Sequence, residues 1–241
     1  MAGLERISPR ILPTRTAVPG RLRHAPSETL SRHRHREAFA AVVLAGGYVE
    51  AGDTGRHRVQ AGDVVLHRAF ESHLDRFDRP GAEVLVLPLA DDWAGPVLGA
   101  VADPDLLARL AERDAGEAEA ALGEALRPGR TTALDWPDLL ALHLREDARA
   151  SLSAWADGMG LRLGSVSRGF RQVYGVSPQA FRLVQRAHQA LDAILRTDAP
   201  LSGVALACGF ADQAHMSRAV AALADAPPAR LRRQARMRAA A

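Results

Sequence analysis

Histidine side chains are concentrated around two short apolar segments in the first half of the chain. His33 and His35 precede one candidate strand, His73 follows another, and His67 lies six residues before His73. Because alternate residues of a strand share a face, His33 and His35 can point into the same interior. Three imidazoles can hold Zn²⁺ or a similar divalent metal and leave one coordination position open. The sequence therefore predicts a histidine cluster that binds either an effector or a metal, with His67 as a further candidate ligand.

A second group of candidate residues lies on helical segments in the last third of the chain. Residues 152–161 fit a short amphipathic helix that ends in glycine, and residues 162–171 fit a second helix after the turn. The second helix would bury one apolar side, made by Val166, Phe170 and Val173. A helix that reads the DNA major groove must expose polar side chains. This helix would expose Ser167, Arg168 and Arg171.

The same scheme repeats after a long helix. Ser177 and Pro178 are a favourable start for a helix that we expect to run to about Arg196. Its apolar side would consist of Phe181, Val184, Leu191, Ile194 and Leu195. Residues 201–207 then predict a short helix, and Asp212 caps a second candidate reader helix. That helix carries Gln213, His215, Ser217 and Arg218.

The charge distribution agrees with DNA binding at the C-terminal end. All 31 basic side chains are arginine, and residues 151–241 hold 12 of them against five Asp, a formal charge of +7. Residues 1–150 carry −4. A basic segment on an acidic body is typical of a nucleic-acid-binding domain joined to another domain.

Other features bear on the compartment. No apolar run reaches the roughly 18 residues of a transmembrane helix, and the first residues lack the layout of a signal peptide. Cys208 is the only cysteine, so it has no intramolecular disulfide partner, and we expect it to lie in the core. We therefore expect a cytoplasmic protein without a membrane partner.

The elements that must position these residues differ between the two halves. From about 37 to 90, short apolar runs end at Gly46-Gly47 and Gly52-Asp53, and others begin after Gly62-Asp63 and Pro80-Gly81. Such runs predict the short strands of an all-β sandwich or barrel. Residues 103–126 carry Leu and Ala at helical spacing. Residues 1–25 show little periodicity, and we expect them to form an arm.

Two segments carry more specific motifs. The sequences Gly-Phe-Ala-Asp-Gln-Ala-His-Met-Ser-Arg at 209–218 and Ser-Arg-Gly-Phe-Arg-Gln-Val-Tyr-Gly-Val-Ser-Pro at 167–178 resemble the signature of the AraC family of bacterial transcription regulators. The likeness covers roughly residues 135–233. It implies two reader helices that enter successive major grooves, about 34 Å apart. The chain departs from the family at Gly164, which often is bulkier, and at Asp225, which usually is Gly.

The resemblance also implies roles for individual residues. Carried over by position, the base-facing candidates are Gly164, Ser167 and Arg168 in the first reader helix and Gln213, His215 and Arg218 in the second. Arg can pair with guanine and Gln with adenine. The candidates for phosphate contacts, which position the protein without reading sequence, are Arg171, Arg182, Arg232 and Arg233. An alternative for Arg168 and Arg218 is a salt bridge with Asp157 or Asp212.

Residues 30–90 are similar to the cupin family, whose first motif carries His-x-His and whose second motif ends in His. Gly62 to His73 keeps the spacing of the second motif, but the Glu of the first would fall at Phe39 or Ala40, so that ligand is missing. The resemblance implies a barrel in which His33, His35 and His73 bind an effector or a metal. Arg34 and Arg36 would then face outward.

Together these features predict an α+β protein. The expected parts are an N-terminal arm (1–25), a cupin-like effector domain (26–95), a helical linker that can also form a dimer contact (96–132) and an AraC-type DNA-binding domain with two helix-turn-helix units (133–235). The expected function is sequence-specific regulation of transcription on double-stranded DNA by a non-enzymatic homodimer. A small-molecule or metal effector would control it, and an activator would also contact RNA polymerase. Two alternatives stay open: a metal-dependent cupin oxygenase or isomerase fused to a DNA-binding domain, and a regulator without an effector.

Overall fold

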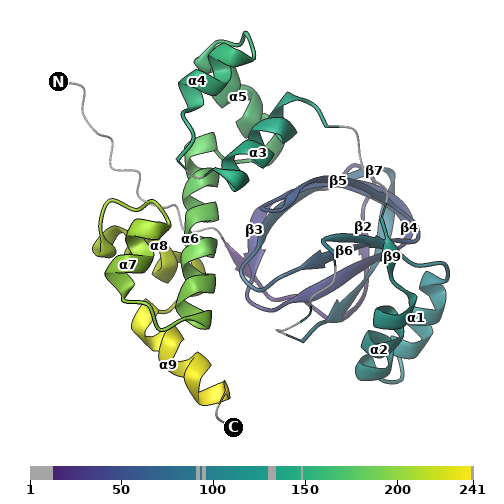
Figure 1. The fold of residues 1–241 in the computed structure, drawn as a ribbon. Helices are drawn as coiled ribbons and strands as arrows, with labels where there is room; N and C mark the ends of the chain where they lie inside the picture. Colours follow the sequence, from purple (N-terminus) through teal and green to yellow (C-terminus); the bar gives the residue numbers. More distant parts are fainter. Residues whose placement is uncertain (1–12, 91–92, 94–95, 130–133, 148, 240–241) are drawn as a thin grey trace. The chain divides into compact units, whose positions relative to one another are not determined.

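The computed structural model describes residues 13–90, 93, 96–129, 134–147 and 149–239. Within them the chain divides into two compact units. One consists of residues 13–139 with 172–175, and the other of residues 140–171 with 176–241. The N-terminal half is built on a β-sheet and the C-terminal part on helices (Figure 1), so the fold is of the predicted α+β class. Residues 1–12 of the predicted arm lie outside the described residues.

The sheet of the first unit contains nine strands in the described residues and curls into a barrel-like shape (Figure 1). Its main path runs β1-β3-β7-β4-β6-β8-β9, while β2 pairs with β7 and β5 with β4. The strands are β1 (Thr14–Arg15), β2 (Gly20–His24), β3 (Thr29–His35), β4 (Phe39–Gly52), β5 (Gly55–Gln60), β6 (Asp63–His67), β7 (Ser72–Pro88), β8 (Leu98–Ala100) and β9 (Arg127–Pro128). Two of them, β4 and β7, are long and carry most of the pairing.

The strand β4 contains an irregularity that changes which residues face the interior. Its pairing with β7 shifts register between Val43 and Ala45 and again between Gly46 and Tyr48. Before the shift, odd-numbered residues such as Val43 belong to the inner core; after it, the even-numbered Tyr48 does. An inserted residue of this kind is a β-bulge, and it reverses the alternation of the strand.

Two sequence predictions about this sheet were wrong. Gly46-Gly47 was expected to end a strand and Pro80-Gly81 to precede one, but the first pair lies inside β4 and the second inside β7. Gly46 and Gly81 have φ angles of +70° and +77°, so they bend continuous strands instead of closing turns. Residues 13–25 were expected in an arm, but β1 pairs with β3 and β2 pairs with β7.

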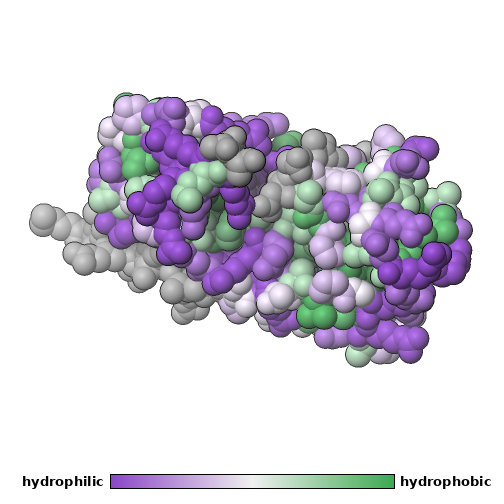
Figure 2. Space-filling model, turned by 90° about the horizontal axis from the view of Figure 1, so that it is seen from below, coloured by the Kyte–Doolittle hydropathy of each residue, from purple (hydrophilic) through white to green (hydrophobic). Residues whose placement is uncertain are grey.

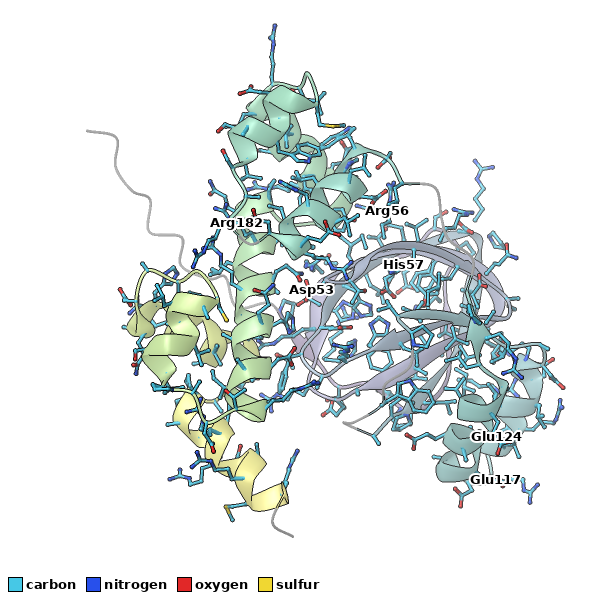
Figure 3. All side chains as sticks on the ribbon, viewed as in Figure 1. Asp53, Arg56, His57, Glu117, Glu124 and Arg182 are labelled. Atoms are coloured by element: carbon cyan, nitrogen blue, oxygen red, sulfur yellow. The ribbon has the colours of Figure 1, made fainter. Side chains whose placement is uncertain are left out.

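Two helices from the predicted linker pack against the sheet. These are α1 (Pro104–Ala111), which begins after the N-cap Asp103, and α2 (Ala115–Ala125), which begins after the N-cap Asp114. Their buried residues Leu107 and Leu122 share one core with Ala40 and Val42 of β4. Packing on the barrel therefore accounts for the apolar side of this helical pair, while Glu117 and Glu124 of α2 point outward (Figure 3).

The second part of the chain is helical. Its elements are α3 (Trp136–Glu146), α4 (Leu152–Gly158), α5 (Leu163–Tyr174), α6 (Pro178–Arg196), α7 (Leu201–Ala207), α8 (Gln213–Ala224) and α9 (Pro228–Ala239). The Ser177 side chain accepts a hydrogen bond from the Ala180 amide and caps α6 as predicted. Most of the predicted apolar side of α6 is buried or half-buried, but Leu195 is exposed. Asp225, in place of the usual Gly, ends α8 in a left-handed conformation.

Apolar residues also occur singly on the surface. Figure 2 shows small green areas among hydrophilic residues. The large exposed apolar side chains come from several elements, for example Leu106 of α1, Leu163 of α5, Leu206 of α7 and Met237 of α9. Scattered residues of this kind are ordinary in folded proteins. None of the helices in the described residues is long and apolar enough to cross a membrane.

The N-cap of α8 allows a first test. The Asp212 carboxylate accepts a hydrogen bond of 2.6 Å from the His215 amide, a donor that the helix itself cannot satisfy. We expect Asp212→Ala to lower the free energy of unfolding by about 0.5–2 kcal/mol, measured by urea denaturation. Asp212→Asn should keep most of this stability because Asn is also a good N-cap. Equal losses in both variants would contradict the capping role.

Candidate functional site

The structure brings together the four histidines that the sequence analysis grouped. His33 and His35 lie on β3, His67 ends β6 and His73 lies near the start of β7, and all four are buried. His73 occupies the centre of the group. The centroid of its ring lies 4.5 Å from that of His33, 5.3 Å from that of His35 and 4.4 Å from that of His67.

A carboxylate that the sequence analysis missed belongs to this cluster. Glu50 of β4 is 1% exposed, and its Oε2 lies 3.3 Å from His67 Nε2 and 3.3 Å from His73 Nδ1. Asp75 is also buried, with Oδ1 3.7 Å from His73 Nδ1. The sequence contains one signal for Glu50, because it lies two residues after Tyr48 and alternate strand residues share a face. A single Glu beside an apolar run predicts little about a site as long as the pairing register of its strand is unknown.

A chain of hydrogen bonds orients two of the rings. His33 Nδ1 donates to the Ser31 carbonyl at 2.9 Å, because a carbonyl can only accept. In the neutral ring His33 Nε2 is therefore an acceptor, and it lies 3.0 Å from His73 Nε2. His73 Nε2 must then carry the proton, and His73 Nδ1 points toward Glu50.

Burial and charge divide the histidines into two kinds. Burial lowers the pKa of His33 to about 4 and that of His35 to about 3, so both rings are neutral at pH 7. Burial also disfavours the charged form of His73, but the Asp75 and Glu50 carboxylates outweigh it and raise its pKa to about 9. The same burial raises the pKa of Asp75 to about 6. Despite burial, His67 and His73 hold the pKa of Glu50 well below its ordinary value.

The four histidines and Asp75 line a cavity of about 570 Å³ inside the barrel. Apolar side chains such as Leu22, Leu30 and Val86 line much of the rest. Cavities of this size, mostly apolar with a few convergent polar groups, are typical of small-molecule sites.

The arginines beside the histidines differ from the prediction. Arg34 was expected to face outward, but it is 3% exposed and its Nε donates to Thr14 Oγ1 at 3.0 Å. The strand β1, which the sequence analysis did not predict, covers it. Arg36 is exposed.

The predicted reader helices are α5 and α8. On α5, Val166 and Phe170 are fully buried and Val173 is half-buried, while Gly164 and Arg168 are exposed and Ser167 is half-buried. On α8, Gln213 and Arg218 are exposed and His215 is half-buried, packed edge-on against Phe210. The alternative of a salt bridge for Arg168 or Arg218 is not seen among the described residues: Arg168 bonds to Ser165 Oγ instead, and Asp212 caps α8.

The predicted phosphate contacts fall into two groups. Arg171 and Arg233 are exposed. Arg182, labelled on α6 in Figure 3, instead donates to the Ala150 carbonyl at 2.9 Å. Arg232 donates to the Ile194 carbonyl at 3.3 Å. Both of these guanidinium groups therefore donate hydrogen bonds to backbone carbonyls of their own unit. Cys208, expected in the core, is half-buried.

The helical part matches a known family. Residues 155–234 match the family model described as a helix-turn-helix domain. The matched residues include α5 and α8, which carry the motifs at 167–178 and 209–218, so this part of the C-terminal unit is a helix-turn-helix domain. No curated protein sequence matches the chain.

Several solved structures resemble the chain more distantly. ToxT from Vibrio cholerae with a bound unsaturated fatty acid is 10% identical, with 88% of this chain and 93% of that one covered and a TM-score of 0.40. The DNA-binding domain of AdpA in complex with a target DNA is 21% identical over 44% of this chain and 96% of that one, with a TM-score of 0.41. An AraC-type regulator from Chromobacterium violaceum is 22% identical over 40% and 88%, with a TM-score of 0.38.

Proposed function

We propose that this protein is a cytoplasmic, homodimeric regulator of transcription, in which an effector bound inside the barrel controls how α5 and α8 engage double-stranded DNA. The observation that carries this proposal is the exposure of Arg168 on α5 and of Gln213 and Arg218 on α8, within the matched helix-turn-helix domain. The opposite side of each helix packs into the core of the unit through buried apolar residues, such as Phe170 on α5 and Met216 on α8. Rigid helices with exposed polar residues are what base recognition requires.

Arg168 is the residue of α5 best suited to read a base. Its guanidinium group is exposed and makes one weak hydrogen bond, Nη2 to Ser165 Oγ at 3.5 Å. We expect Arg168→Ala to weaken specific DNA binding by about 1–3 kcal/mol and to relax the preference at one base position. The operator would first be selected from random double-stranded DNA with the full chain, and affinity then measured by fluorescence anisotropy. Unchanged affinity and base preference would refute this role.

Arg171 is expected to act differently, as a phosphate contact. It is exposed one turn after Ser167 on α5. We expect Arg171→Ala to weaken binding evenly on all DNA sequences and to lower the slope of log affinity against log salt by about one. Measurements between low and moderate salt, on the operator and on unrelated DNA, test this. A changed base preference with an unchanged salt slope would show that Arg171 reads a base instead.

Effector control rests on the cavity of the barrel. The buried residues His33, His35 and His73 line this cavity and offer hydrogen-bonding atoms to an effector. An effector that binds one arrangement of the protein better than another shifts the population toward it and so changes DNA affinity. Operator affinity would be measured with and without each compound that raises the melting temperature of the full chain. If every such compound leaves operator affinity unchanged, the protein is a regulator without an effector.

The remaining parts of the proposal concern assembly. The helices α1 and α2 pack on the barrel through Leu107 and Leu122, which leaves their outer side for a dimer contact. Sedimentation of the full chain on operator DNA measures the number of subunits bound. A contact with RNA polymerase is expected only if transcription in a purified system rises when the protein is added.

A further inference from the structure

Two sets of metal-ligating atoms share the His73 ring. One set consists of His33, His35 and His73, and the other of Glu50, His67 and His73. In each set the ligand atoms lie within 4.8 Å of one another. The first is the set that the sequence analysis expected, and the second includes a residue that it missed. The two sets differ in whether their polar atoms already have partners.

The histidine-only set is partly satisfied by hydrogen bonds. His33 uses both ring nitrogens, one with the Ser31 carbonyl at 2.9 Å and the other with His73 Nε2 at 3.0 Å. A metal ion bound by His33 Nε2 and His73 Nε2 would have to break the bond between them. The cost of that rearrangement argues against the first set.

The second set consists of buried atoms without hydrogen-bond partners. Among the described residues, Glu50 Oε2, His67 Nε2 and His73 Nδ1 make no hydrogen bond. Their side chains are only 1%, 5% and 8% exposed. Their contacts with one another are the ion-pair contacts of 3.3 Å from Glu50 Oε2 to each imidazole nitrogen. Buried polar atoms are almost always satisfied, and a cation held between these three would satisfy all of them at once.

The distances fit a small divalent cation. Zn²⁺ binds imidazole nitrogen and carboxylate oxygen at about 2.0–2.2 Å with tetrahedral geometry, which places neighbouring ligand atoms about 3.3–3.6 Å apart. Glu50 Oε2 lies 3.3 Å from both His67 Nε2 and His73 Nδ1. Two imidazole nitrogens and one carboxylate oxygen are also a donor set that such ions prefer, and the ion would displace the proton from His73 Nδ1.

We propose that Glu50, His67 and His73 form a binding site for a divalent transition-metal ion of the Zn²⁺ type, with His73 bound through Nδ1. The site goes beyond the proposed regulatory function, since no step of DNA binding requires it. No carboxylate stands at Phe39 or Ala40, where the sequence comparison expects one. Glu50, near the other end of the same strand β4, supplies it instead. A three-residue set leaves a fourth position for the Asp75 carboxylate, which is 3.7 Å from His73 Nδ1, or for the polar group of an effector in the cavity.

In this arrangement His33 is a positioning residue. A metal-binding histidine usually donates its other ring N–H to an oriented acceptor. His73 Nε2 donates to His33 Nε2, which is held as an acceptor by the bond from His33 Nδ1 to Ser31. Loss of such an orienting partner typically weakens metal affinity about 10–100-fold.

The test uses the untagged full-length protein, stripped with a chelator and reloaded with Zn²⁺. Affinity is measured by competition with a chromophoric chelator, and stoichiometry by elemental analysis after gel filtration. The variants are Glu50→Gln, His67→Gln and the matched control His35→Gln, since His35 and His67 are both buried beside His73. We expect one Zn²⁺ per chain in the wild type. Glu50→Gln and His67→Gln should each lose more affinity than the roughly 10–100-fold expected for an orienting residue, and His35→Gln should change it less than about threefold.

Other outcomes would overturn the proposal. An absence of Zn²⁺ in the wild type would remove the site. Retention of Zn²⁺ in Glu50→Gln together with its loss in His35→Gln would move the ion to the histidine-only set. Circular dichroism shows whether each variant is folded. If a variant unfolds, the absorption spectrum of the wild type loaded with Co²⁺ still tests the proposed site. Intense visible bands indicate tetrahedral coordination, and weak bands would contradict it. All measurements are made without DNA, so their failure leaves the regulatory proposal intact.

Discussion

Phe170→Ala is expected to lower the free energy of unfolding of the helix-turn-helix unit by about 3–5 kcal/mol and to abolish operator binding. Phe170 is fully buried on α5, and its ring packs edge-on against that of Phe181 on α6, with centroids 5.4 Å apart. The substitution removes this aromatic contact and leaves a cavity. Together these two effects give a free-energy cost at the upper end of the range for core residues. A loss of this size is a large fraction of the stability of an ordinary domain, which is about 5–15 kcal/mol.

Hydrogen exchange followed peptide by peptide measures this effect in α5 and α6 and separately in β4. The exchange of β4 should stay close to that of the wild type if the effect is local. Leu206→Ala on α7 is a matched control, because Leu206 belongs to the same unit but is 70% exposed. The control should lie within about 0.5 kcal/mol of the wild type. If Leu206→Ala destabilises α5 as much as Phe170→Ala does, the aromatic core is not what holds the reader helix.

Gly46→Ala is expected to destabilise the barrel by a comparable amount, for a different reason. Gly46 has a φ angle of +70°, and a Cβ atom placed on it would lie 2.0 Å from the Gly81 carbonyl oxygen. The left-handed conformation costs a residue with a side chain about 1–3 kcal/mol. The clash is with backbone of the neighbouring strand, which cannot rotate away, and overpacking of this kind adds about 1–3 kcal/mol.

A substitution at a second glycine, Gly20, separates the conformational cost from the cost of the clash. Gly20 also has a positive φ angle, +109°, but nothing lies within 4 Å of the position that a Cβ atom would take there. Gly20→Ala should therefore show the conformational cost alone. The melting temperature and the exchange of β4 and β7 measure both variants. If Gly46→Ala is no worse than Gly20→Ala, the two strands are not held as closely as the structure shows.

The same close approach matters for the histidine cluster. The bulge at Gly46 lies between Val43 and Tyr48 and so sets the side of the sheet on which Glu50 lies. A variant that shifts this bulge should also weaken the contact between Glu50 and the two histidines His67 and His73. Zn²⁺ affinity of Gly46→Ala, measured beside its stability, would show whether the bulge and the cluster are coupled.

Local patterns along the chain were enough to predict most of the helical part. The predicted bounds of α6 and α7 are those of the structure, and the caps Ser177 and Asp212 make the expected hydrogen bonds. These signals are local, because a cap satisfies amides within three residues and helical periodicity repeats within one turn. Exposure of Arg168 and burial of Phe170 follow from the same periodicity. Even here Leu195, at the end of α6, is exposed, although its neighbour Ile194 is fully buried.

Which side chains meet inside the barrel depends on long-range strand pairing. Alternation along β4 predicts one face for every second residue, but the bulge reverses the faces, so the odd-numbered Phe39 and the even-numbered Glu50 both point to the histidines. Glu50 meets His73 through pairing of β4 with β7, across residues distant in the sequence. Neither the reversal nor the register is written in a local pattern, because both depend on how two long strands bend around each other. The chain alone showed four histidines that could gather; the sheet brought the buried carboxylate to them.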